Sequence, residues 1–210
     1  MKVEIWSDVM CPFCYIGKRR FEEALQQFPG KDSVTVEWKS FQLNPDMVTD
    51  PSKNINQYLA EHKGISIEQA KQMNDRVTTM ALEAGLKYDF DKAIVANSFD
   101  AHRLSHWSKQ YGKQDAMEER LFRAYFTEGK NTADHETLAL LAAEIGLDEQ
   151  EARTFLAGKV FSEAVEQDIY EAQQVGARGV PFFVFDNKYA VSGAQPSSLF
   201  LQVLNKIAEA

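Results

Sequence analysis

The sequence predicts an α/β protein with a four-stranded mixed sheet, helices on both faces and a large all-helical insertion. A strand, a helix and a second strand follow one another in about the first 45 residues. Residues 52–175 then show only helical patterns, and two strand patterns and a final helix follow. We therefore expect one domain from residues 1–51 and 176–210, with residues 52–175 as an inserted helical subdomain.

The N-terminal segment is typical of a strand–helix–strand unit. Residues 2–6 show a strand pattern, and residues 16–28 carry apolar side chains on one helical stripe. After a Pro29-Gly30 turn, residues 34–43 alternate apolar and polar side chains and stop at Asn44-Pro45. Such a unit is expected to be right-handed, with its two strands parallel.

Helix signals fill the insertion. Ser66 and Gln69 form a capping-box pattern at a helix start, and Gly85 is typical of the end of that helix. Apolar side chains at helical spacing predict five more helices, over about residues 99–111, 117–125, 138–145, 148–156 and 161–175. We expect this subdomain to cover the edge of the sheet that carries the cysteines.

Strand patterns return in the C-terminal segment. Residues 180–185 form an apolar strand, a tight turn over residues 186–188 follows, and residues 189–191 supply the hairpin partner. Pro196 opens a last amphipathic helix. The order of elements is therefore β-α-β, a helical block, and β-β-α.

The composition of the chain argues against some classes of binding partner. The chain has 210 residues, is 44% hydrophobic and 26% charged, and has a net charge of −8. The negative charge argues against nucleic acid and against an anionic membrane. No apolar run approaches the ~20 residues that a membrane helix needs, and no signal-peptide pattern precedes the first strand, so we expect a cytoplasmic protein. The sequence makes no prediction of oligomeric state.

The only two cysteines, Cys11 and Cys14, form a C-x-x-C pattern at a strand-to-helix junction. The helix dipole and free N–H groups at a helix start favour an anion, and they stabilise a thiolate on the first sulfur. Pro12 suits the first helical turn, because its missing N–H would have been unpaired there. Two cysteines in a cytosolic chain favour redox chemistry over a structural disulfide.

Four motifs give the chain a resemblance to a known family. They are Ser7-Asp8-x-x-Cys11-Pro12-Phe13-Cys14-Tyr15-Ile16-Gly17-Lys18-Arg19, Phe41-Gln42-Leu43-Asn44-Pro45, Asn97-x-x-x-Ala101-His102-Arg103 and Gly179-Val180-Pro181-Phe182-Phe183-Val184. With these motifs the chain resembles DsbA-type thioredoxin-fold oxidoreductases, and most of all the FrnE-like cytoplasmic subgroup. The resemblance implies a thioredoxin fold and thiol–disulfide exchange with thiol or disulfide substrates.

The resemblance also implies roles for individual residues. Cys11 would attack, Cys14 would resolve the mixed disulfide, and Pro181 would be a cis-proline facing the disulfide. Pro12, Phe13 and Val180 would bind substrate, as would His102 on the helical cap, for which a surface or packing role is the alternative. No metal or organic cofactor is expected, although glutathione could serve as redox partner or co-substrate.

Other functions stay open at this point. The family includes glutathione-dependent kappa-class transferases and 2-hydroxychromene-2-carboxylate isomerases, which typically carry serine where this chain has Cys11. The loop Ser192–Gln195 matches the place where those relatives grip glutathione. A Cys2His2 zinc site from both cysteines, His102 and His106 is a further alternative, although the long gap between the pairs argues against it.

Glu4 is a candidate proton relay beneath the active site. It lies in the first predicted strand, seven residues before Cys11. In the alternative interpretation it points to solvent, because it alternates with the apolar Val3 and Ile5.

Overall fold

The central sheet of this computed structural model, which describes residues 1–209, has the strand order β2-β1-β5-β6. Its strands are β1 (Lys2–Ser7), β2 (Thr35–Ser40), β5 (Phe182–Phe185) and β6 (Tyr189–Ser192). β1 pairs with β2 in parallel and with β5 antiparallel, and β5 pairs antiparallel with β6. The predicted mixed sheet and thioredoxin topology are confirmed.

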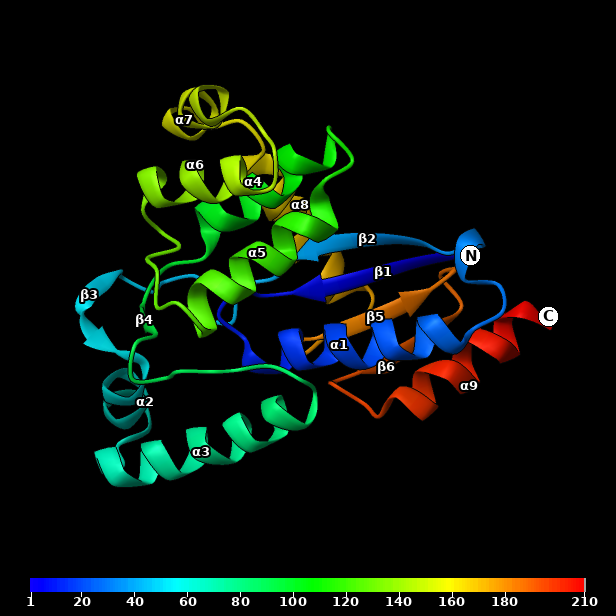
Figure 1. Cartoon of the computed structure of the whole chain (residues 1–210), viewed down its shortest axis with the longest axis horizontal. Helices are drawn as coiled ribbons and strands as arrows, with labels where there is room; N and C mark the ends of the chain where they lie inside the picture. The colour runs from blue at the N-terminus through cyan, green and yellow to red at the C-terminus, as the bar shows by residue number, and fades with distance from the viewer. Residues whose placement is uncertain (210) are drawn as a thin grey trace.

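Helices cover both faces of this sheet. The long helix α1 (Pro12–Gln27) and the C-terminal helix α9 (Ser197–Ala208) pack together on one face (Figure 1). Phe21, Phe183 and Phe200 join them to β5 through edge-to-face and tilted ring contacts. On the other face Trp6 contacts helix α8 and donates its indole N–H to the Asp168 carbonyl at 2.8 Å.

The insertion lies at the end of the sheet toward which β1 and β2 point (Figure 1). Its helices are α2 (Ile55–Lys63), α3 (Ile67–Glu83), α4 (Phe99–Lys109), α5 (Gln114–Phe126), α6 (His135–Glu144), α7 (Glu149–Ala157) and α8 (Ser162–Gln174). The Ser66–Gln69 capping box is present at the start of α3, and Gly85 adopts a left-handed conformation after its end.

Two features of this segment differ from the prediction of helices alone. A small separate sheet joins β3 (Asp50–Asn54) to β4 (Ile94–Val95), and α2 precedes the first helix that we predicted. β3 is polar and contains a proline, so it shows no strand alternation. α2 begins at a capping box formed by Asn54 and Gln57, a pairing that resembles that of Ser66 and Gln69. Neither small strand enters the central sheet.

One apolar core runs through the sheet and the insertion. The cluster of buried side chains that contains Ile5 and Ile16 also contains Leu121 and Phe122 of α5. Helix α5 packs on β2, and α3 packs on α1. The insertion is therefore held against both strands and helices of the sheet domain, close to the start of α1.

Candidate active site

Cys11 is the N-cap residue of α1, and Pro12 is the first residue inside the helix. Cys14 lies on the first turn, where its N–H donates to the Cys11 carbonyl at 3.0 Å. The two cysteines are free thiols that approach each other to 3.5 Å. This distance is short enough for a disulfide to form with a small side-chain movement.

Both thiols are buried. Cys11 is 3% exposed and Cys14 is 0% exposed. Burial raises the pKa of the Cys14 thiol well above its ordinary value, and the neighbouring Cys11 sulfur adds to this effect. Cys14 is therefore protonated at neutral pH.

The Val180–Pro181 peptide bond is cis, as the resemblance implies. The Cys11 thiol donates a hydrogen bond to the Val180 carbonyl, with 3.4 Å between Sγ and O. Pro181 packs directly on α1 at Gly17, where an added Cβ would lie 2.9 Å from the proline Cγ. The cysteines and Pro181, which are far apart in the sequence, thus meet at one point.

The neighbouring Ser192–Gln195 loop also contacts this strand. Gly193 donates its N–H to the Pro181 carbonyl at 2.8 Å and has a φ of 82°, a conformation that favours glycine. The Arg20 guanidinium donates to the Ala194 carbonyl at 2.6 Å. These bonds give the loop a structural role in holding the Pro181 segment.

A groove of about 590 Å³ opens at Cys11. Pro12, Phe13 and Val180 line it, and their substrate-binding role stays a prediction. The other walls come from the loop after β2, from α2 and from α3, and most of them are apolar. The lining side chains farther from the cysteine include Leu43, Met47, Ile55, Tyr58, Leu59, His62, Lys63, Met73, Asn74, Val77 and Phe90.

His102, for which the resemblance implies substrate binding, is not among the residues that line this groove. Its side chain is buried, and Nε2 lies 3.5 Å from Oδ1 of the fully buried Asp8. Burial alone would lower the pKa of His102. The contact with Asp8 and the charges of Glu118 and Asp168 outweigh burial and raise that pKa. The contact with Asp8 holds His102 behind the cysteine loop and outside the groove.

Asp8 belongs to the first motif, but we assigned it no role from the sequence. Its carboxylate accepts hydrogen bonds from the N–H of Leu43 at 2.7 Å and of Met10 at 3.4 Å. Its carbonyl accepts from the N–H of Cys11 at 2.9 Å. It therefore joins the cysteine loop to the groove wall. A charged residue next to a C-x-x-C motif was the signal that could have identified it.

Tyr88 is a second site residue to which we assigned no role from the sequence. Its hydroxyl donates to the Pro12 carbonyl at 2.7 Å, and its ring stacks on Phe126 of the insertion. Burial raises its pKa. Tyr88 lies outside any motif and outside the helices, so no sequence pattern indicated this contact.

Glu4 is not brought to the cysteines. Val3 and Ile5 face the α1 side of the sheet, so strand alternation directs Glu4 to the opposite face, on the side of Trp6. Its carboxylate accepts a hydrogen bond from Lys2 at 2.9 Å. Asp8, rather than Glu4, is the buried carboxylate beside the cysteine pair.

The Cys2His2 zinc alternative is not supported by the geometry. His102 pairs with Asp8, and His106 lies 2.9 Å from the carboxylate of Asp168. Among residues 1–209 no group of three or more His, Cys, Asp or Glu side chains is arranged to hold a metal ion.

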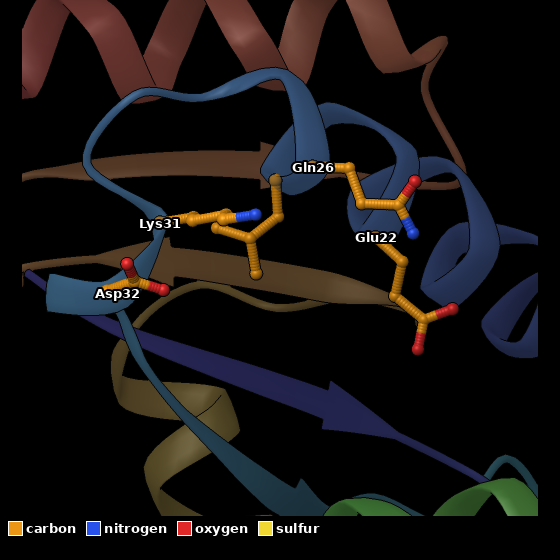
Figure 2. A pocket seen from close by; sticks show the side chains of 5 residues that line it. Glu22, Gln26, Lys31 and Asp32 are labelled. Atoms are coloured by element: carbon orange, nitrogen blue, oxygen red, sulfur yellow. The ribbon is translucent and has the colours of Figure 1, made fainter.

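A second hollow lies at the far end of α1, beside the turn that leads into β2 (Figure 2). Glu22, Gln26, Lys31 and Asp32 line it with Leu25. These charges are mixed in sign, and no thiol or histidine is present. The groove at Cys11 is therefore the better candidate for an active site.

The fold and the cysteine pair define a thioredoxin-fold protein with a C-x-x-C site. The chain belongs to the DsbA-like thioredoxin domain family, whose model matches residues 2–205. It is 41% identical to a probable DsbA oxidoreductase from Streptomyces coelicolor, with a TM-score of 0.94 over 100% of this chain and 90% of the other.

Two further relatives extend this comparison. The uncharacterized protein YwbO of Bacillus subtilis is 30% identical over 97% of this chain and 95% of its own length. The cytosolic disulfide reductase DsbM of Pseudomonas aeruginosa shares the fold, with 18% identity and a TM-score of 0.71 over the whole of both chains. No helix within residues 1–209 has the length and apolar character that crossing a membrane requires.

Proposed function

We propose that this protein is a thiol–disulfide oxidoreductase that acts through Cys11 and Cys14 by mixed-disulfide exchange. The observation that carries the proposal is the pair of free thiols 3.5 Å apart at a helix N-terminus, with Cys11 at the end of an apolar groove. Membership of the DsbA-like family supports it. Assignment to the FrnE-like subgroup rests on the sequence motifs and is part of the same proposal.

The proposed reaction follows from the different environments of Cys11 and Cys14. Cys11 attacks, as a thiolate, one sulfur of a substrate disulfide and releases the other as a thiolate. Cys14 then loses its proton and attacks the Cys11 sulfur of the mixed disulfide. The second substrate thiolate leaves and is protonated. Overall one disulfide is transferred from substrate to protein, and the reverse sequence transfers it back.

The groove favours an apolar substrate. Phe13, Met47 and Met73 offer adaptable apolar surface, while the cationic Lys63 stands near the far end. The backbone of Val180 beside the thiol would bind an extended segment as an added strand does. We propose disulfides or thiols flanked by apolar residues as substrates, with glutathione as an alternative redox partner. A cytoplasmic location agrees with that of DsbM.

Two variants test this proposal side by side. Cys11→Ser should abolish exchange, because a serine hydroxyl is too weakly acidic to attack without its own base. Cys14→Ser should still attack and then accumulate mixed disulfides, which a non-reducing gel displays. Wild-type turnover by Cys14→Ser, with no trapped adduct, would instead favour a glutathione-dependent transferase or isomerase.

A further inference from the structure

The hydroxyl of Tyr88 bonds to the short segment that links the two cysteines. Its oxygen donates to the Pro12 carbonyl at 2.7 Å. Pro12 and Phe13 are the residues between the two sulfurs, so this bond acts on the backbone that sets the separation of the thiols. Within residues 1–209, Tyr88 is the only side chain that hydrogen-bonds to the backbone of residues 11–14.

Tyr88 is itself held in place by the end of α5. On one side of it the Lys87 carbonyl accepts from the Thr127 hydroxyl at 2.8 Å, and on the other the Asp89 N–H donates to the Phe126 carbonyl at 2.7 Å. The ring is buried and stacks on the Phe126 ring, with 4.6 Å between their centroids. The insertion therefore fixes the position of the hydroxyl independently of α1.

The first turn of a helix loses its order readily, because its N–H groups have no partners within the helix and the ends fray. In the disulfide form, the bond between the sulfurs would hold this turn closed. In the dithiol and mixed-disulfide forms that covalent link is absent, and the Tyr88 bond limits how far the turn opens. Fewer open arrangements mean that less conformational entropy is lost when the two sulfurs join.

We infer that Tyr88 is a positioning residue for closure of the cysteine pair, whose bond to the Pro12 carbonyl keeps the Cys14 sulfur within reach of the Cys11 sulfur. This role rests on the exchange reaction proposed above. In the closing step a bond forms between the two cysteine sulfurs, and the bond between Cys11 and the substrate sulfur breaks. The departing substrate thiolate takes up the proton that Cys14 loses. The substrate disulfide is the oxidant, and Tyr88 exchanges neither proton nor electron.

Tyr88→Phe removes the hydroxyl and keeps the ring. We expect the equilibrium constant for oxidation of the dithiol by oxidised glutathione to fall about three- to tenfold, the effect of losing one hydrogen bond. Tyr125→Phe is the matched control, because Tyr125 is also buried, its ring contacts the same Phe126, and its hydroxyl has no hydrogen-bond partner within residues 1–209. Its constant should stay within about twofold of wild type. Alkylation of free thiols across a series of glutathione buffers, followed by mass spectrometry, measures each constant.

A kinetic measurement separates closure from the first attack. An aromatic disulfide releases one coloured thiolate when Cys11 attacks it and a second when Cys14 resolves the mixed disulfide. Tyr88→Phe should slow the second release about three- to tenfold and leave the first within about twofold of wild type. A general loosening of the fold would slow both releases.

The possible outcomes separate the two proposals. An oxidation constant of Tyr88→Phe within about twofold of wild type, an equal fall in Tyr125→Phe, or equal slowing of both releases would overturn the role of Tyr88. A wild-type protein that forms no disulfide between Cys11 and Cys14 in any of the glutathione buffers would overturn the oxidoreductase proposal instead.

Discussion

Glycine at position 17 permits the close contact between α1 and the Pro181 segment. A methyl group there would lie 2.9 Å from the Pro181 Cγ and 3.5 Å from the Phe183 ring. The first distance is shorter than van der Waals contact, and a proline ring cannot rotate away. The position of the proline relative to the thiols therefore depends on the absence of a side chain at residue 17.

We expect Gly17→Ala to destabilise the protein by about 1–3 kcal/mol through overpacking and to reduce exchange activity. Urea denaturation and a dithiol-oxidation assay measure the two effects. Gly158→Ala is the control, because a Cβ there would meet only the Phe155 carbonyl oxygen at 3.6 Å. Wild-type stability of Gly17→Ala would show that the segment can shift freely.

His102 gives a prediction about pH. Its pKa is raised in the folded protein, because the effects of Asp8, Glu118 and Asp168 exceed that of burial. A raised histidine pKa contributes stability that is complete below the unfolded value of about 6.5 and is lost as the pH rises through the folded value. The destabilisation caused by His102→Gln should thus be larger at about pH 5.5 than at about pH 9. Urea denaturation at both pH values measures it, and a difference that grows with pH would contradict the assignment.

At the scale of elements, helix α3 forms an outer wall of the groove. Met73 lines the groove and is 41% exposed, whereas Leu82 is on the same helix, is 64% exposed and does not line it. The two positions allow a charge to be added inside and outside the groove without disturbing the core.

Met73→Glu should raise the KM for a disulfide peptide with apolar flanks by roughly three- to tenfold, since the substrate would lose apolar contact. Exchange with bis(2-hydroxyethyl) disulfide should be unchanged, because it is too small to reach α3. Leu82→Glu should resemble wild type with both substrates. An equal loss with both substrates in Met73→Glu would show that the apolar wall does not select substrate.

The elements that the sequence predicted are those with a local signal. The capping box at Ser66 and the alternation around Trp38 are confirmed by α3 and β2. β3 lacks such a signal, because its pairing with β4 is made by the tertiary structure. The orientation of Glu4 also depends on the tertiary structure. Both faces of β1 are covered, so strand alternation alone could not show which face carries the cysteines.

The site was predictable for those residues that belong to sequence motifs and that the fold brings together. Cys11 and Val180 belong to motifs and meet as the resemblance implies. The burial of His102 against Asp8 was not predictable, because the pairing of buried charges depends on contacts between distant segments. Tyr88 was missed for the same reason.

At the scale of the whole molecule, one core joins the sheet to the insertion. The buried cluster that includes Ile5 of β1 continues to Leu121 of α5. The division at residues 51/52 and 175/176 stays a prediction about domains, while the shared core argues for cooperative unfolding.

We expect a single unfolding transition. Trp6 and Trp38 report on the sheet and Trp107 on the insertion, so tryptophan fluorescence samples both parts. Its transition should coincide with that of far-ultraviolet circular dichroism in urea. Two separated midpoints would show that the insertion unfolds on its own.

The antiparallel pairing of β5 with β1 determines when, during synthesis, the surroundings of the cysteines can form. The cysteines occur near the start of the chain, whereas Val180 and the strand that completes their surroundings occur near its end. At the usual rate of synthesis, roughly 10–30 s pass on the ribosome between the appearance of the two parts. During that interval the thiols lack the Val180 carbonyl and the buried environment that raises the pKa of Cys14. A nascent chain therefore carries two ordinary thiols, and the cysteine pair reaches its folded surroundings only after residues 180–185 have been synthesised.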